Sequence, residues 1–232
     1  LSLRDEIVNG LLHRPSIGND VVLTIDSRIQ RVADEALGAE HGAIVVLDVR
    51  SGAVIALASH PYFDPNRLET DIERLKNDAA RPLLNRATQG LYPPGSTFKT
   101  VTLAAALEYE RVSPSTVFTY TLPPDAQHHG WWHVSEQGIL CANHPGNNSP
   151  FDLTVAYAWS CNVAFGDMGL AIGADAYTEM ARRFGLGRSI PFDLPVVASQ
   201  LYTTPDYFSG QERFYALAST AFGQGQLALT PL

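Results

Sequence analysis

Hydrophobic and polar positions in the first sixty residues follow patterns that predict a strand, a helix and a hairpin. Residues 20–26 (DVVLTID) are a short β-branched run, which predicts a strand. Residues 42–59 contain two apolar runs around the turn sequence DVRSG, which predicts a hairpin buried on at least one face. Between them we expect a helix with Asp26 or Ser27 as its N-cap, because apolar residues recur there at helical spacing: Ile29, Val32, Ala33, Ala36 and Leu37.

The rest of the chain has longer apolar segments with helical character. Residues 72–90 predict one short helix followed by irregular chain, and residues 98–107 are apolar or small on nearly every side, which predicts a buried helix. Residues 120–150 are rich in Pro, Gly and Asn and predict a long irregular surface loop. Residues 151–173 and 174–187 predict two helices, the second ended by glycine. This order of elements favours an α/β fold with a separate all-helical lobe.

Composition and charge narrow the classes of function. The chain has 232 residues, of which 45% are hydrophobic and 17% charged, as in a folded domain rather than a disordered one. Its net charge of −8 and its lack of a basic stripe argue against a nucleic-acid partner. No apolar run approaches the roughly 20 residues that cross a bilayer. Two cysteines, Cys141 and Cys161, allow one disulfide at most.

The polar residues of segment 120–150 raise the option of a metal site. Their spacing, H-H-x3-H-x7-C-x2-H, matches no established ligand pattern, and histidines in a polar loop are usually solvated. We therefore expect neither a metal ion nor a cofactor.

The first candidate for chemistry is the stretch LYPPGSTFK, residues 91–99. Ser96 and Lys99 stand three residues apart at the start of the buried helix, which places both side chains on one face. A lysine amine in dry surroundings can take the proton of a serine hydroxyl and make it a nucleophile. The N–H groups of the helix start would favour negative charge on a bound carbonyl oxygen. The ordinary alternative is a capping serine beside a solvated lysine, because S-x-x-K is common by chance.

A second short motif, S-x-N at Ser160 and Asn162, strengthens the catalytic interpretation. S-x-x-K together with S-x-N and K-T-G is the signature of penicillin-binding proteins and serine β-lactamases. A second serine can relay a proton to a leaving group, and an asparagine amide can bind a peptide-like substrate. Alone, S-x-N is commoner still, and its ordinary interpretation is a solvated helix end.

Several segments in order resemble the transpeptidase domain of class B penicillin-binding proteins, the D,D-transpeptidases of peptidoglycan synthesis. The resemblance covers nearly all of residues 20–232. Five stretches carry it: VVLTIDSRIQRVADEAL, GAIVVLDVRSGAVIALASHPYFDPN, LNRATQGLYPPGSTFK, WSCN and FGQGQLALTPL. It implies the α/β fold of the penicillin-binding transpeptidases and serine β-lactamases, a mainly antiparallel sheet flanked by helices, with an all-helical lobe at about 97–222.

The resemblance also implies a reaction without metal or cofactor. Ser96 would attack the D-Ala-D-Ala carbonyl of a stem peptide, form an acyl-enzyme, and pass the acyl group to an amine of another stem. Lys99 would be the general base, Ser160 a proton shuttle, and Asn162 a contact to substrate and to Lys99. Substrate would bind at Gly95, Ser96, Ser160 and Asn162, with the Ser96 N–H as half of the oxyanion hole. β-Lactams would acylate the same serine.

One part of the family signature is absent. The only lysines are Lys76 and Lys99, so the chain contains no K-T-G. We interpret the chain as C-terminally incomplete and without the C-terminal strands of the sheet, which leaves the activity of these 232 residues open. Residues 1–19 would link to an N-terminal pedestal and membrane anchor, and residues 20–232 would form the transpeptidase domain, on the extracytoplasmic face of a bacterial cytoplasmic membrane.

The partners implied are stem peptides, β-lactam antibiotics, a membrane glycosyltransferase, and division or elongation proteins. Two alternatives from other classes stay open. A β-lactam sensor domain would keep a stable acyl-enzyme without turning over stem peptide, and a catalytically silent cell-wall scaffold would not be acylated. A β-lactamase is a weaker candidate, because no Glu-x-x-x-Asn-type deacylation segment is evident.

Overall fold

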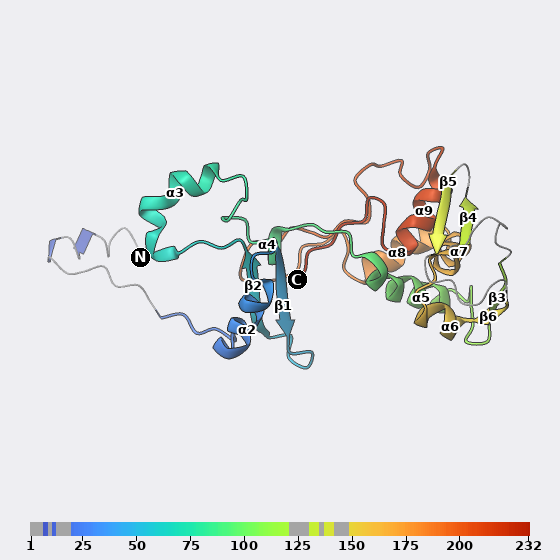
Figure 1. The fold of residues 1–232 in the computed structure, drawn as a ribbon, viewed down its shortest axis with the longest axis horizontal. Helices are drawn as coiled ribbons and strands as arrows, with labels where there is room; N and C mark the ends of the chain where they lie inside the picture. The colour runs from blue at the N-terminus through green and yellow to red at the C-terminus, as the bar shows by residue number, and fades with distance from the viewer. Residues whose placement is uncertain (1–6, 9–10, 13–19, 121–129, 135–136, 142–148) are drawn as a thin grey trace.

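The elements of the chain fall into two groups joined by a bundle of extended segments (Figure 1). One group is a β-hairpin with a helix on it and the short helices of residues 65–89 on the same side, and the other is a lobe of helices with two small strand pairs. The computed structural model describes residues 7–8, 11–12, 20–120, 130–134, 137–141 and 149–232.

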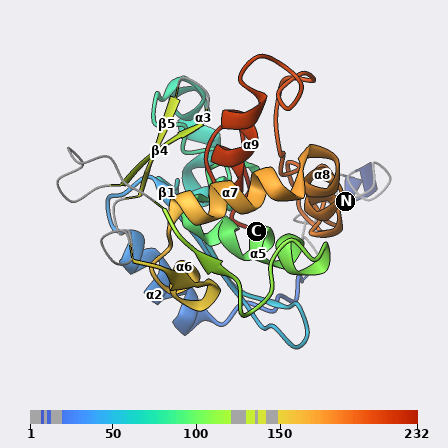
Figure 2. The ribbon, with the colours of Figure 1, turned by 90° about the vertical axis from the view of Figure 1, so that its right-hand side faces the viewer.

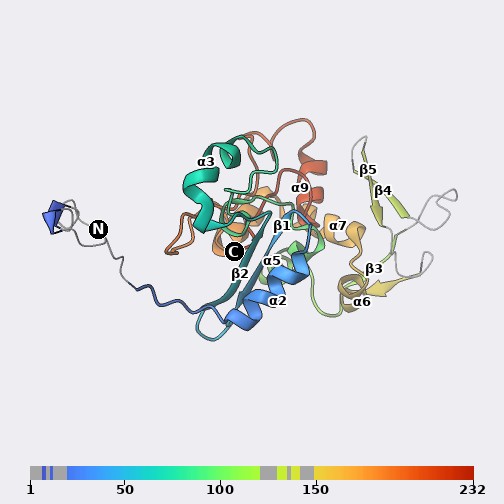
Figure 3. The same cartoon turned by 60° about the vertical axis from the view of Figure 1, so that its left-hand side comes forward.

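The first group is the predicted hairpin with its helix. Strands β1 (Gly42–Leu47) and β2 (Val54–His60) pair antiparallel, and α2 (Ser27–Leu37) lies across them (Figure 3). Every second residue of β2 is buried, which is the alternation expected of a sheet covered on one face. Asp26 caps α2 by accepting a hydrogen bond from the backbone N–H of Arg28, so the predicted helix and its cap are confirmed.

The predicted strand at 20–26 is wrong, because these residues have no regular structure. Individual hydrogen bonds rather than a ladder connect this segment to β2, including one of 2.9 Å from the Asp26 N–H to the Ile55 carbonyl. The side chain of Gln30 occupies the outer edge of β2 instead. Its amide donates to the Leu57 carbonyl at 3.2 Å and accepts from the Leu57 N–H at 2.8 Å. A strand edge satisfied by a helix side chain leaves no ladder for a further strand at that position.

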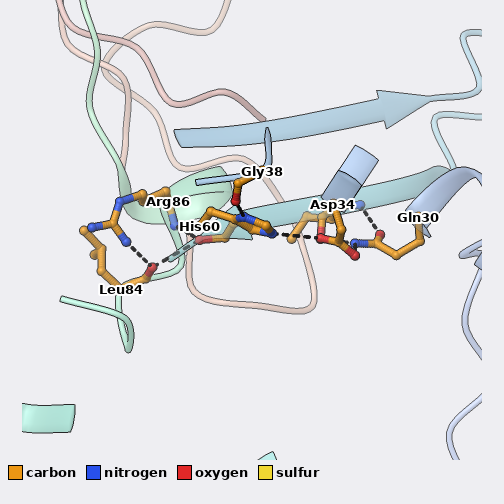
Figure 4. Close-up of polar contacts among 8 residues, drawn as sticks. Gln30, Asp34, Gly38, His60, Leu84 and Arg86 are labelled. Carbon is orange, nitrogen blue, oxygen red and sulfur yellow. Dashed lines mark hydrogen bonds and ion pairs between the residues drawn. The ribbon is translucent and has the colours of Figure 1, made fainter. Parts of the chain in front are cut away.

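The buried side chain of His60 connects the C-terminal end of α2 to β2. The Nδ1 of His60 donates to the Gly38 carbonyl oxygen at 3.1 Å, and its Nε2 lies 3.4 Å from Asp34 Oδ1 (Figure 4). His60 ends β2, whereas Asp34 and Gly38 belong to the C-terminal turn of α2. Side chains near both ends of α2 therefore join the helix to β2.

The chain approaches the first candidate motif through two short helices rather than one. After a 3₁₀ turn, η1 (Pro65–Arg67), α3 (Leu68–Asn77) begins earlier than predicted, and α4 (Arg86–Gln89) adds a single turn. The buried Arg86 guanidinium holds the intervening chain by donating to the carbonyls of Ala80, at 2.6 Å, and Arg81, at 3.1 Å.

The second group is the predicted helical lobe. A 3₁₀ turn, η2, leads into the buried helix, and α7 crosses the centre of the lobe between α5 and α9 (Figure 2). Within the described residues, no helix combines the length and the apolar character needed to span a membrane. The bounds are η2 (Gly95–Phe98), α5 (Lys99–Glu108), α6 (Leu153–Ala158), α7 (Asn162–Ile172), α8 (Ala174–Arg183) and α9 (Arg213–Ala221).

Two predictions for this lobe need correction. The single helix predicted at 151–173 is two helices, α6 and α7, separated by a tight turn. Segment 120–150, predicted to be irregular, contains an antiparallel pair of strands, β4 (Gly130–Val134) and β5 (Gln137–Cys141). A third pair joins β3 (Val117–Phe118) to β6 (Phe151–Asp152). All paired strands in the described part of the chain are antiparallel, as expected.

The last ten residues run along the segment that leads to Ser96. Leu229 exchanges backbone hydrogen bonds of 2.8 and 2.9 Å with Tyr92, and Ala228 exchanges bonds of 3.0 and 2.8 Å with Gln200. Nearer the motif, the Gly95 N–H donates to the Gly223 carbonyl at 3.0 Å. Three parts of the chain that are distant in sequence are thus joined between the two groups of elements.

Candidate active site

The S-x-x-K motif lies on a 3₁₀ turn rather than on the first turn of an α-helix. Gly95 to Phe98 form η2, and α5 begins only at Lys99. Residues i and i+3 eclipse one another in a 3₁₀ turn, which places Lys99 directly above Ser96. Ser96 is exposed to solvent, whereas Lys99 keeps only 1% of its surface exposed. The Ser96 hydroxyl therefore lies on the solvent side of the turn and the Lys99 amine on the buried side.

The S-x-N motif lies where two helices meet end to end. Helix α6 ends in a Schellman motif, in which the Cys161 N–H bonds to the Ala156 carbonyl and the Ser160 N–H to the Tyr157 carbonyl, both at 3.0 Å. Ser160 occupies the left-handed position of this motif with φ of 55°, a conformation that usually belongs to glycine. Helix α7 starts at Asn162, so the turn presents both motif residues on one side.

Lys99 brings the two motifs together. Its Nζ lies 3.2 Å from Ser96 Oγ, 2.8 Å from Ser160 Oγ and 2.6 Å from Asn162 Oδ1. The backbone carbonyl of Ser160 lies 2.7 Å away as well. All four residues predicted to be catalytic therefore gather around one buried amine.

The chemistry of these four oxygens matters because an ammonium group has only three N–H donors. The Ser160 carbonyl and Asn162 Oδ1 can only accept, so they take two N–H groups in either charge state of the amine. The hydroxyls of Ser96 and Ser160 can accept from an ammonium or donate to the lone pair of a neutral amine. The arrangement can hold Lys99 before and after it takes a proton from a serine.

Apolar packing closes the inner side of the site. The ring of Phe165, fully buried on α7, has its centroid 5.5 Å from Lys99 Nζ. Lys99 lies one turn before Thr102, whose hydroxyl donates to the Ala221 carbonyl at 2.7 Å and lies 2.7 Å from the Tyr177 hydroxyl. Burial raises the pKa of Tyr177 above its usual range, which keeps the phenol neutral. Because Lys99 is buried and the Phe165 ring lies beside its Nζ, the amine has the dry surroundings that the sequence predicted.

Gly95 and its neighbours were only partly anticipated. Gly95 begins the 3₁₀ turn that carries Ser96, and its N–H is directed to Gly223, so its role in substrate binding stays a prediction. The sequence analysis gave Gly223 no role of its own; the two glycines of FGQG are the signal that could have pointed to an unusual backbone there. The disulfide hypothesis for Cys141 and Cys161 and the metal hypothesis for segment 120–150 depend on side chains that the structure does not describe, so both stay hypotheses. Among the residues that the structure describes, no cluster suited to a metal ion is found.

Comparison with known proteins places this geometry in a family. A family model of the penicillin binding protein transpeptidase domain matches residues 42–232. The peptidoglycan D,D-transpeptidase MrdA of Acinetobacter baumannii is 32% identical over 231 residues, which cover 94% of the chain and 33% of that protein. The peptidoglycan D,D-transpeptidase PbpA of Mycobacterium tuberculosis is 36% identical over 93% of the chain and 44% of its own length. The chain thus spans less than half of these relatives.

Comparison with solved structures leads to the same family. The ceftriaxone acyl-enzyme complex of penicillin-binding protein A from M. tuberculosis superposes with a TM-score of 0.78 at 32% identity, over 97% of the chain and 51% of that structure. Pseudomonas aeruginosa PBP2 in complex with WCK 5153 gives a TM-score of 0.78 at 28% identity, over 94% and 48%. Sequence, fold and the meeting of S-x-x-K with S-x-N agree, and the chain belongs to the penicillin-binding protein transpeptidase family, among the class B proteins.

Proposed function

We propose that the protein carrying this chain is a peptidoglycan D,D-transpeptidase in which Ser96 is the nucleophile. The observation that carries the proposal is the buried Lys99 amine, which lies within hydrogen-bond distance of Ser96 Oγ, Ser160 Oγ and Asn162 Oδ1. Such a group of nucleophile, base and second hydroxyl is suited to acyl transfer. The names of the relatives, which are peptidoglycan D,D-transpeptidases, support it.

The distances around Lys99 support the following course of acylation. Ser96 Oγ attacks the carbonyl carbon of the penultimate D-Ala in a stem peptide, and its proton passes to the neutral amine of Lys99. The C–N bond breaks, the departing D-Ala amine receives a proton through Ser160, and an ester to Ser96 remains. Asn162 orients Lys99 and the peptide. An amine of a second stem then attacks the ester, forms the cross-link and releases Ser96.

The domain limits and the location belong to the same proposal. Residues 20–232 belong to the transpeptidase domain, with its helical lobe at about 97–222, and residues 1–19 link to a preceding pedestal. Substrates and β-lactams reach such a domain on the extracytoplasmic face of the membrane, where peptidoglycan is cross-linked. A glycosyltransferase and division or elongation proteins are the expected protein partners.

The test is the intact mass of the full-length protein with and without excess benzylpenicillin. We expect an added mass of one opened β-lactam, mapped to Ser96 by digestion and absent from Ser96→Ala. The full-length protein is used because the 232 residues contain no K-T-G, which supplies the second oxyanion donor in the family.

Release of D-Ala from a D-Ala-D-Ala stem peptide separates the remaining alternatives. A transpeptidase forms the adduct and also releases D-Ala with transfer to an acceptor amine. A stable adduct without release would assign the protein to β-lactam sensing. Absence of any adduct would leave a silent scaffold and contradict the proposed function.

A further inference from the structure

Gly223 packs directly against the peptide unit that joins Gly95 to Ser96. The Gly223 carbonyl accepts the Gly95 N–H at 3.0 Å. Gly223 has φ of 86°, and a Cβ at this position would overlap the carbonyl group of Gly95. Both the backbone conformation and the close approach therefore require glycine.

The peptide unit that touches Gly223 is the one that carries the Ser96 N–H. A peptide unit is rigid and planar, so displacing its carbonyl oxygen rotates its N–H as well. In the reaction that the family resemblance implies, this N–H is a donor to the oxyanion, and such a donor acts only when it points at the developing charge. Gly223 thus fixes the direction of a group that it does not contact itself.

The turn that carries Gly223 is itself held from both sides. On one side, the Gly223 N–H donates to the Thr220 carbonyl at 2.9 Å, a bond to the last turn of α9. Three residues later, Gln226 Oε1 accepts from the backbone N–H and hydroxyl groups of Thr203 and Thr204, at 2.8 to 3.0 Å. The Tyr207 hydroxyl accepts the Gln226 N–H at 3.3 Å and fills the space where Gly225 would carry a Cβ.

We infer that Gly223 is a positioning residue for acylation, which orients the Ser96 N–H, and that Gln226 supports it by anchoring the turn 223–226. The inference rests on the proposed function, because it assigns a role within the same reaction. Neither residue contacts the reacting atoms. Their effect passes through the Gly95–Ser96 peptide.

The experiment compares Gly223→Ala with Gly52→Ala in the full-length protein. Gly52, in the turn between β1 and β2, has φ of 75°, and no heavy atom lies within 4 Å of the place that a Cβ would occupy. It therefore matches the backbone strain of Gly223 without the close contact. Benzylpenicillin acylation is followed over a range of concentrations, which separates the limiting rate from the half-saturating concentration. Final adduct mass and thermal unfolding are recorded for each variant.

We expect Gly223→Ala to lower the limiting rate about 100-fold or more, the loss typical of one oxyanion donor, with complete acylation at long times. Gly52→Ala should acylate like wild type. Wild-type rates in a folded Gly223→Ala protein would overturn the inference and leave the proposed function intact. A wild-type protein without any adduct would overturn both.

A second pair of variants decides the case if Gly223→Ala does not fold. Gln226→Leu removes the oxygen that accepts from Thr203 and Thr204, whereas Gln226→Glu keeps an oxygen at that place. A slower limiting rate in Gln226→Leu that returns towards wild type in Gln226→Glu supports the inference. Equal limiting rates in wild type and Gln226→Leu contradict it.

Discussion

At the scale of single residues, Ser160 has a backbone conformation that opposes its local preference. Its φ of 55° is a conformation in which an L-residue is strained, and glycine would end α6 at lower cost. The strain coincides with a hydroxyl 2.8 Å from Lys99 Nζ. Strained backbone at a reactive group is a common feature of active sites. Serine at this position exchanges stability for a polar group that glycine lacks.

We predict that Ser160→Gly is more stable than Ser160→Ala by about 0.5–1 kcal/mol, because both lose the hydroxyl but only alanine keeps the left-handed strain. Both should acylate with benzylpenicillin about 10- to 100-fold more slowly than wild type, as expected for the loss of a proton relay. Urea unfolding and acylation rates measure the two effects. Equal stability of the two variants would show that the turn is not strained.

At the scale of elements, the packing of α7 against α9 fixes the position of the residues that α7 contributes to the site. Gly169 on α7 faces Ala221 on α9, and a Cβ on Gly169 would lie 2.5 Å from that of Ala221. The absence of a side chain lets the two helices approach closely. Since α7 also begins with Asn162 and carries Phe165, this contact determines where part of the site lies.

Gly169→Ala should destabilise the fold by about 1–2 kcal/mol, because overpacking outweighs the gain in helix propensity. Adding Ala221→Gly should recover part of the loss, with a coupling energy of at least about 1 kcal/mol in a double-mutant cycle. Urea unfolding of the four proteins measures this energy. Strict additivity would argue against direct contact between the two positions.

Tyr177 links three helices through one chain of hydrogen bonds. The Thr102 hydroxyl on α5 donates its hydrogen bond to the Ala221 carbonyl on α9, so it accepts from the Tyr177 phenol on α8. This series of hydrogen bonds exists only while the Tyr177 phenol is protonated. Burial raises the folded-state pKa of Tyr177 above the usual value near 10, whereas the unfolded chain titrates at that value.

Stability should therefore fall as the pH rises above about 10, by up to about 1.4 kcal/mol per pH unit from this residue, because the folded state then binds more protons than the unfolded state. Below pH 10 the contribution is fully present. Tyr177→Phe should remove this part of the slope while lowering stability at neutral pH. Urea midpoints of both proteins from pH 8 to 11 test it, and parallel curves would contradict the assignment.

At the scale of the whole molecule, the last residues join the parts that the rest of the chain builds separately. Leu229 pairs with Tyr92 in the approach to Ser96, and Ala228 pairs with Gln200. The Leu232 N–H reaches the Ala87 carbonyl at 3.1 Å. The position of Ser96 thus depends on residues more than a hundred positions away in sequence.

We expect Leu229→Pro to cost about 2–3 kcal/mol of stability and to slow acylation, because proline removes the N–H that bonds to the Tyr92 carbonyl. Leu229→Val keeps both backbone bonds and should resemble wild type in rate. Thermal unfolding and benzylpenicillin acylation of the two variants provide the comparison. A fully active, fully stable Leu229→Pro protein would show that this pairing does not hold the approach segment.

The sequence by itself determined the features that depend on near neighbours. The hairpin, the capped helix α2 and the burial of α5 follow from periodicity and turn residues, which act within a few positions. The pairing of Ser96 with Lys99 is equally local, because three residues of helical turn bring them together. Resemblance in the order of motifs then indicated the family.

Tertiary structure alone decided the rest. Residues 20–26 look like a strand, but Gln30 satisfies the strand edge that they would need. Residues 151–173 look like one helix, yet the chain breaks at Ser160 against its local preference, where Lys99 binds a residue 61 positions later in sequence. The role of Gly223 becomes visible only beside Gly95. In each case the deciding partner is distant along the chain, and no local pattern contains its position.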